Sequence, residues 1–137
     1  MRLLMISALA CLALTACKQD AVAGDPLAAF GRNVEWHVTE IAGQPVPTDT
    51  SVTMEIREEG LLGGSGGCNR YNGRINVVDG ALHLGELAGT RMMCPEAQMQ
   101  TERNFHAALT RAKQASATGD ALEITDAAGK VLIRATK

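Results

Sequence analysis

Short segments in which apolar and polar residues alternate occur through much of the chain, and this pattern constrains the fold most strongly. Val52, Met54 and Ile56 alternate with polar neighbours between 51 and 57. The same period of two returns later in the chain, in 71–77, 82–84, 122–124 and 131–133. Successive side chains of a β-strand point to opposite faces, so this pattern predicts antiparallel strands with one buried face.

Turn residues separate these segments. Asp79-Gly80, Gly119-Asp120 and the stretch 126–129 each lie between two alternating runs and predict hairpin connections. The glycine-rich stretch 60–67 predicts a bulged or sharply bent strand where backbones approach closely. A phosphate-binding loop is the alternative, but no Lys-Ser/Thr pair follows it and no helical pattern begins there.

One helix is expected over about 96–112. Pro95 suits a first helical position, and Glu96 complements the helix dipole. Residues at helical spacing form a predicted packing face: Thr101, Phe105, Ala108, Leu109 and Ala112. Polar residues are expected to point outward or to flank that face: Gln98, Glu102, Arg103 and Arg111. Strands on both sides of one helix indicate an α+β domain.

The N-terminus has the pattern of an export signal. Arg2 precedes an apolar run over 3–14, which is too short to span a bilayer as a helix. The run ends in Leu14-Thr15-Ala16-Cys17, which resembles the lipobox of bacterial lipoproteins. That resemblance implies removal of residues 1–16, with Cys11 among them, and lipidation of Cys17. An ordinary secretory signal and a buried N-terminal helix are the alternatives.

Several acyl chains on one cysteine suffice for stable membrane anchoring. Lys18 follows the cysteine, and by the same resemblance it favours the outer membrane, with the protein facing the periplasm. Residues 17–33 lack periodicity and are interpreted as the lipidated N-terminus and a tether, leaving a domain over 34–137. The apolar patch 27–30 suggests an alternative in which this segment packs on the domain.

The composition argues against nucleic acid as a partner. The formal net charge is −2, and no basic cluster interrupts the chain. The sequence contains one Trp, one Tyr and two Phe, too few for a surface on which bases stack.

Two cysteine-containing motifs differ from the plain strand pattern: the segments 67–73 (GCNRYNG) and 90–95 (TRMMCP). Together with Trp36, they resemble the META domain of HslJ-like lipoproteins. The resemblance implies a curved antiparallel sheet, or a partial open β-barrel, with one packed helix. It also implies a non-enzymatic envelope protein that supports envelope integrity or stress and antibiotic tolerance, through contacts with an envelope protein or a small hydrophobic ligand.

Cys68 and Cys94 are expected to form a disulfide, because thiols outside the inner membrane are normally oxidised or paired. Two reduced, buried cysteines are the alternative. None of His37, His83 and His106 has a recognised metal-ligand spacing, so no metal and no cofactor are expected. A cysteine nucleophile would need an oriented histidine, which the sequence does not reveal, and no catalytic residue is assigned.

Polar residues around the two motifs have two interpretations. In the favoured one, Asn69 satisfies turn backbone groups and Arg70 pairs with a nearby acid. In the other, Asn69, Arg70 and Arg91, with Asn72, form a polar cluster that binds a partner or an anionic ligand.

A second functional class is a periplasmic inhibitor or binding protein for a secreted enzyme such as lysozyme. Such inhibitors display a Ser-Gly-x-x-Tyr loop. Here Ser65-Gly66 is too far from Tyr71 to match that loop.

Overall fold

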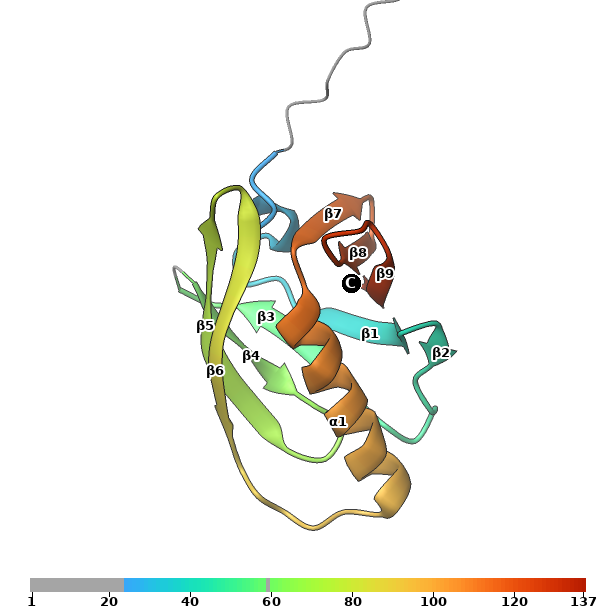
Figure 1. Ribbon diagram of the computed structural model, residues 1–137. Helices are drawn as coiled ribbons and strands as arrows, with labels where there is room; N and C mark the ends of the chain where they lie inside the picture. Colours follow the sequence, from blue (N-terminus) through green and yellow to red (C-terminus); the bar gives the residue numbers. More distant parts are fainter. Residues whose placement is uncertain (1–23, 59) are drawn as a thin grey trace, which may run out of the picture.

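A computed structural model describes residues 24–58 and 60–137, and Figure 1 shows its arrangement. A short 3-10 helix, η1 (Ala28–Phe30), precedes the sheet. The strands before the α-helix are β1 (Trp36–Ile41), β2 (Gln44–Pro45), β3 (Thr53–Ile56), β4 (Leu61–Ser65), β5 (Arg70–Val78) and β6 (Ala81–Gly89). After α1 (Glu96–Arg111) come β7 (Gln114–Thr118), β8 (Ala121–Thr125) and β9 (Val131–Thr136). The α+β class predicted from the sequence is confirmed.

The sheet is antiparallel, strongly curved and open. Its strand order is β6-β5-β4-β3-β1-β9-β8-β7, with β2 paired to β1, so that β6 and β7 are the two edges. Leu82 N donates to Lys113 O over 2.8 Å and Gln114 Nε2 to Gly80 O over 2.9 Å, and these two hydrogen bonds join the edges at one end. Helix α1 lies across the remaining opening (Figure 1). The predicted curved sheet with one packed helix is therefore correct, and the barrel is not closed.

The core occupies the concave side of the sheet, beneath α1. Its largest fully buried side chains include Phe30, Trp36, Met54, Leu62, Ile75, Leu82, Phe105, Leu109, Ile124 and Ile133. All the core residues described, including the partly buried ones, fall between Leu27 and Ala135. The chain without its first 17 residues therefore retains this entire core and forms a folding unit of its own.

The packed domain begins earlier than the sequence predicted. Phe30 is fully buried, and the Trp36 indole N–H donates to its carbonyl oxygen over 2.7 Å. Leu27 also packs against the core. The predicted tether over 17–33 is thus too long, because its last part folds onto the sheet. Cys17 and the other residues before Gly24 lie outside the described part of the chain.

The glycine-rich strand β4 confirms the prediction of close backbone approach. A Cβ atom on Gly64 would lie 2.2 Å from the carbonyl oxygen of Thr53. Thr53 itself is buried, although alternation predicted that it would face solvent. Its hydroxyl accepts a hydrogen bond from Ser65 N, and its carbonyl accepts one from the Tyr71 hydroxyl. These partners explain why a polar residue is tolerated there.

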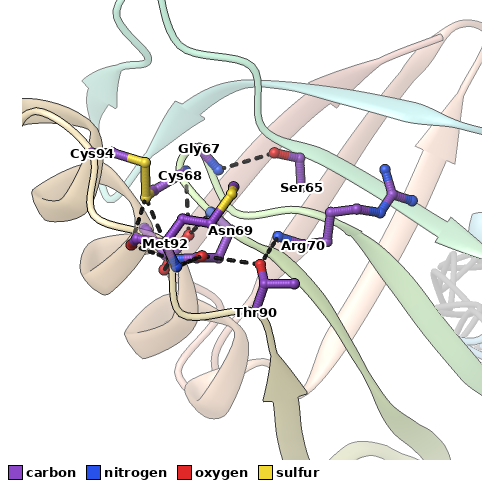
Figure 2. The surroundings of a disulfide bond; sticks show 9 residues. Ser65, Gly67, Cys68, Asn69, Arg70, Thr90, Met92 and Cys94 are labelled. Carbon is purple, nitrogen blue, oxygen red and sulfur yellow. Dashed lines mark hydrogen bonds between the residues drawn. A yellow bond between two sulfur atoms is a disulfide. The ribbon is translucent and has the colours of Figure 1, made fainter.

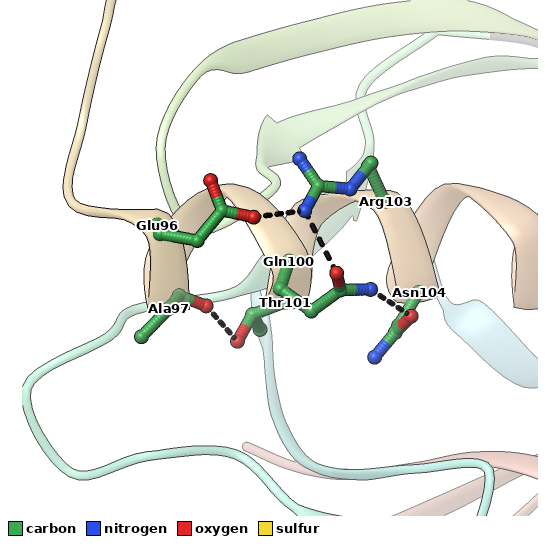
Figure 3. Close-up of polar contacts among 6 residues, drawn as sticks. All are labelled: Glu96, Ala97, Gln100, Thr101, Arg103 and Asn104. Atoms are coloured by element: carbon green, nitrogen blue, oxygen red, sulfur yellow. Dashed lines mark hydrogen bonds and ion pairs between the residues drawn. The ribbon is translucent and has the colours of Figure 1, made fainter.

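Helix α1 begins at Glu96, as predicted, with Pro95 as its N-cap rather than its first helical residue. The predicted packing face is buried, and it includes Ala112 just after the last helical residue. On the solvent side, Arg103 donates to Glu96 and Gln100 (Figure 3). Within the described residues, no helix is long and apolar enough to cross a bilayer.

Candidate functional site

Cys68 and Cys94 form the predicted disulfide, with their Cα atoms 5.8 Å apart (Figure 2). Cys68 lies between β4 and β5, and Cys94 lies two residues before α1. The bridge therefore joins the turn after the glycine-rich strand to the segment that leads from β6 into the helix. In this state, neither sulfur is a thiolate, which is the form that a nucleophile or a metal ligand requires.

Asn69 occupies the centre of a hydrogen-bond cluster beside the disulfide (Figure 2). Its Oδ1 accepts hydrogen bonds from Met92 N at 2.6 Å and from the Thr90 hydroxyl at 3.0 Å. Its Nδ2 donates to the Met92 carbonyl at 3.4 Å and to Glu102 Oε1 at 3.0 Å. The interpretation that Asn69 satisfies turn backbone groups is therefore the one that the structure supports.

Glu102 completes this cluster from α1, and the sequence did not identify it. Its Oε2 accepts hydrogen bonds from the backbone N–H groups of Cys68 and Asn69. Burial raises the pKa of Glu102, but the hydrogen bonds from Asn69 and Cys68 outweigh burial and hold the pKa below its ordinary value. The helical period placed Glu102 only as a flanking residue. In the sequence, a carboxylate beside the packing face of a helix looks the same whether it accepts hydrogen bonds from water or from the backbone of a turn.

His106 lies one helical turn after Glu102 and packs against aromatic rings. Its ring makes an edge-to-face contact with Tyr71, with centroids 5.6 Å apart, and a tilted contact with Phe105. Its Nε2 atom is buried and has no hydrogen-bond partner within the described residues. Burial lowers the pKa of His106, and the negative charge of Glu102 offsets only part of that effect.

A hollow of about 400 Å³ lies between the β6 edge and α1. It brings together three of the predicted partner-binding residues: Asn69, Arg70 and Arg91. Leu87, Ala88, Gly89, Thr90, Glu102 and His106 also line it. Asn72 is on the outer face of β5, in an adjacent hollow with Arg57 and Gly63 that Arg70 also lines. The structure therefore assembles most of the predicted set and separates Asn72 from Arg91.

Arg70 lacks the ion pair that the favoured interpretation predicted. That interpretation paired it with a nearby acid, but neither Arg70 nor Arg91 forms an ion pair with any described residue. Both side chains are exposed. The hollow thus has two arginines at its border that form no ion pair within the described chain, and the carboxylate of Glu102 on its α1 side.

A larger hollow of about 600 Å³ lies beneath η1, near the point where residue 24 begins the described chain. Its apolar lining comes from Leu27, Ala28, Ile56, Ile75 and Val77. Charged residues also line it: Asp25, Arg32, Glu58 and Arg74. Its volume is within the range typical of small-molecule sites.

This geometry bears on two alternative functions, inhibition of a secreted enzyme and metal binding. Tyr71 is buried, and its hydroxyl donates to the Thr53 carbonyl, so it is not displayed as an inhibitor loop would require. For metal binding, residues 24–58 and 60–137 contain no group of three or more His, Cys, Asp or Glu side chains arranged to hold an ion.

Comparison with known families identifies the class of protein that this fold defines. The family model of the META domain matches residues 27–137, and the chain belongs to that family. Membership places it among proteins associated with the bacterial envelope and with stress. The matched region begins at Leu27, the first residue that packs against the core, which agrees with the corrected domain boundary.

Two solved structures share the fold. An NMR structure of a protein from Burkholderia xenovorans is 25% identical, with a TM-score of 0.65, and the match covers 82% of this chain and 88% of that one. A second NMR structure is 24% identical, with a TM-score of 0.59 and coverage of 80% and 92%, and shows the fold alone. No curated protein matches the chain.

Proposed function

We infer that this protein is a non-enzymatic lipoprotein of the bacterial outer membrane, anchored through Cys17 and facing the periplasm. It supports envelope integrity under stress, including tolerance of hydrophobic antibiotics, through contacts with a protein or a small hydrophobic molecule. The observation that carries this proposal is the Cys68–Cys94 disulfide. Structural disulfides persist in oxidising compartments, so the bridge supports the export that the N-terminal signal predicts.

The arrangement of the domain is compatible with such an anchor. The described chain begins beside η1, at one end of the sheet, whereas the segment between β6 and α1 lies at the opposite end (Figure 1). An anchor at Cys17 would place the hollow beneath η1 near the membrane. A hydrophobic molecule that partitions into the bilayer would then reach this hollow from the membrane side.

Metabolic labelling with a palmitate analogue tests the anchor. In the native bacterium, the full-length protein and a Cys11→Ser variant should both incorporate the label and fractionate with the outer membrane. Cys17→Ser should do neither. Cys11→Ser is the matched control, because the lipobox interpretation removes Cys11 with the signal peptide. Label on the Cys17→Ser variant, or none on the wild-type protein, would contradict the proposal.

A deletion strain tests the physiological role. Loss of the protein should increase sensitivity to a hydrophobic antibiotic, and the wild-type gene should restore tolerance. The Cys17→Ser gene should restore less, because an unanchored domain would not be held at the outer membrane. If the deletion leaves sensitivity to both antibiotic and heat unchanged, the envelope role is wrong.

A further inference from the structure

We propose that the end of the molecule opposite η1 binds an extended, acidic polypeptide segment, which adds as a strand to the free edge of β6. The distal surface, as we call it, comprises Arg70, Leu87, Gly89, Arg91, Met92 and Met93. This inference rests on the proposed function only for its orientation toward the periplasm. It deepens that function by specifying the class of partner and where it binds.

The first observation is the unpaired edge of β6. Thr90 N donates to Arg70 O on β5 over 3.1 Å. Because successive N–H groups along a strand point to opposite sides, the N–H groups of Leu87 and Gly89 point away from β5. Neither makes a backbone hydrogen bond outside the β5–β6 pairing within the described chain. A bulge after Leu84 separates this free stretch from Leu82, where Lys113 closes the edge.

The second observation is the hollow alongside this edge. Leu84 and Leu87 pack against the core but are only partly buried, because no further strand follows β6 in the sheet. The hollow, with His106 and Glu102 on its α1 side, is bordered by backbone that can pair with an added strand. Strand addition obtains its affinity from main-chain hydrogen bonds and its specificity from side-chain pockets of this kind.

The third observation is the charge of the surface. Arg70 and Arg91 are exposed and have no ion-pair partner within the described chain. The one carboxylate in the hollow, Glu102, already accepts three hydrogen bonds from Cys68 and Asn69. An incoming segment with an Asp or Glu side chain beside Arg91 would therefore meet the two arginines, whereas the ionised Glu102 and Glu86, which is exposed farther along β6, disfavour acidic residues elsewhere in the segment.

The fourth observation is the clamped loop, residues 90–94. The disulfide holds Cys94, and Asn69 holds both the N–H and the carbonyl of Met92. Yet Met92 is 56% exposed and Met93 is 87% exposed. Because the backbone of this loop is already fixed, it loses little backbone entropy on binding, and the flexible methionine side chain adapts well to a partner surface. We infer that Met93 is an apolar anchor for the partner segment.

Selection of random linear peptides on the chain from residue 18 onward tests the proposal without a membrane. Enriched peptides should carry an acidic residue and alternating apolar residues. A synthetic peptide of the enriched sequence should protect the Leu87 and Gly89 amides from hydrogen exchange, measured by NMR. Arg91→Glu and Met93→Ser should each weaken its binding at least about tenfold.

Two matched variants at the η1 end are the controls. Arg32→Glu and Val78→Ser alter an exposed arginine and an exposed apolar residue there, and should leave binding unchanged. Absence of any enriched peptide, equal binding to all variants, or unprotected Leu87 and Gly89 amides would overturn the proposal. Concentration-dependent protection of these amides without peptide would instead identify a second copy of the chain as the occupant, and would also overturn it. Since no lipid is involved, these outcomes are independent of the palmitate experiment.

Discussion

The side-chain amide of Asn69 donates a hydrogen bond to Glu102 Oε1 over 3.0 Å, joining the turn before β5 to the middle of α1. The same carboxylate accepts from the backbone N–H of Cys68, which also carries the disulfide to Cys94. The helix is therefore fixed to the glycine-rich part of the sheet by one covalent and several polar links. These links hold α1 across the opening between β6 and β7.

Replacing Glu102 by Gln tests the polar links. The variant keeps one acceptor oxygen but turns an NH₂ group toward N–H donors, so turn amides lose partners. We expect unfolding free energy to fall by about 1–3 kcal/mol, measured by urea denaturation. Glu96→Gln is the matched control on the same helix. The Glu96 side chain is 73% exposed, and its variant should change stability by less than about 0.5 kcal/mol. Equal effects of both variants would show that the turn does not depend on Glu102.

Removing the disulfide tests the covalent link. The bridge joins residues with a sequence separation of 26, and the loop-entropy relation gives a loss of about 3–4 kcal/mol for the double variant Cys68→Ser, Cys94→Ser. A reducing agent should lower the urea midpoint of the wild-type protein and leave that of the double variant unchanged. A wild-type midpoint that does not respond to reduction would show that the bridge is not formed in solution.

The sequence predicted the sheet well, because the period of two is a local property of each strand and the turn residues separate the strands. The disulfide was also predicted, because the N-terminal signal indicates export and thiols outside the inner membrane are normally oxidised or paired. The role of Glu102 was not predicted, and the burial of Phe30 was expected only in the alternative in which the patch 27–30 packs on the domain. A carboxylate beside an apolar helix face has the same pattern whether it binds solvent or a turn, and η1 is too short to show any periodicity. The open edge of β6 depends on contacts between distant segments, which no local pattern reports.

Gly64→Ala tests the close packing of β4 on β3. The added methyl group would lie 2.2 Å from the Thr53 carbonyl oxygen, so the backbone of one strand must shift. We expect a loss of at least about 2 kcal/mol in unfolding free energy, or failure to fold. Gly129→Ala is the control, because Gly129 has a positive φ of 80° but nothing within 4 Å of an added Cβ. Its cost should be limited to about 1–2 kcal/mol of backbone strain.

His106 should make the protein less stable as pH falls below about 6.5, the ordinary pKa of histidine. Burial lowers its pKa in the folded state, so between the two pKa values the unfolded chain binds more protons, and unfolding free energy decreases as pH decreases. Glu102, whose pKa is lowered from 4.5, adds a further loss that begins only at more acidic pH. His106→Phe keeps an aromatic ring against Tyr71 and removes the titration, so its urea midpoint should change less between pH 7.5 and pH 5. His83→Gln, which alters an exposed histidine on β6, should keep the wild-type slope. If His106→Phe also keeps that slope, the acid sensitivity arises elsewhere in the domain.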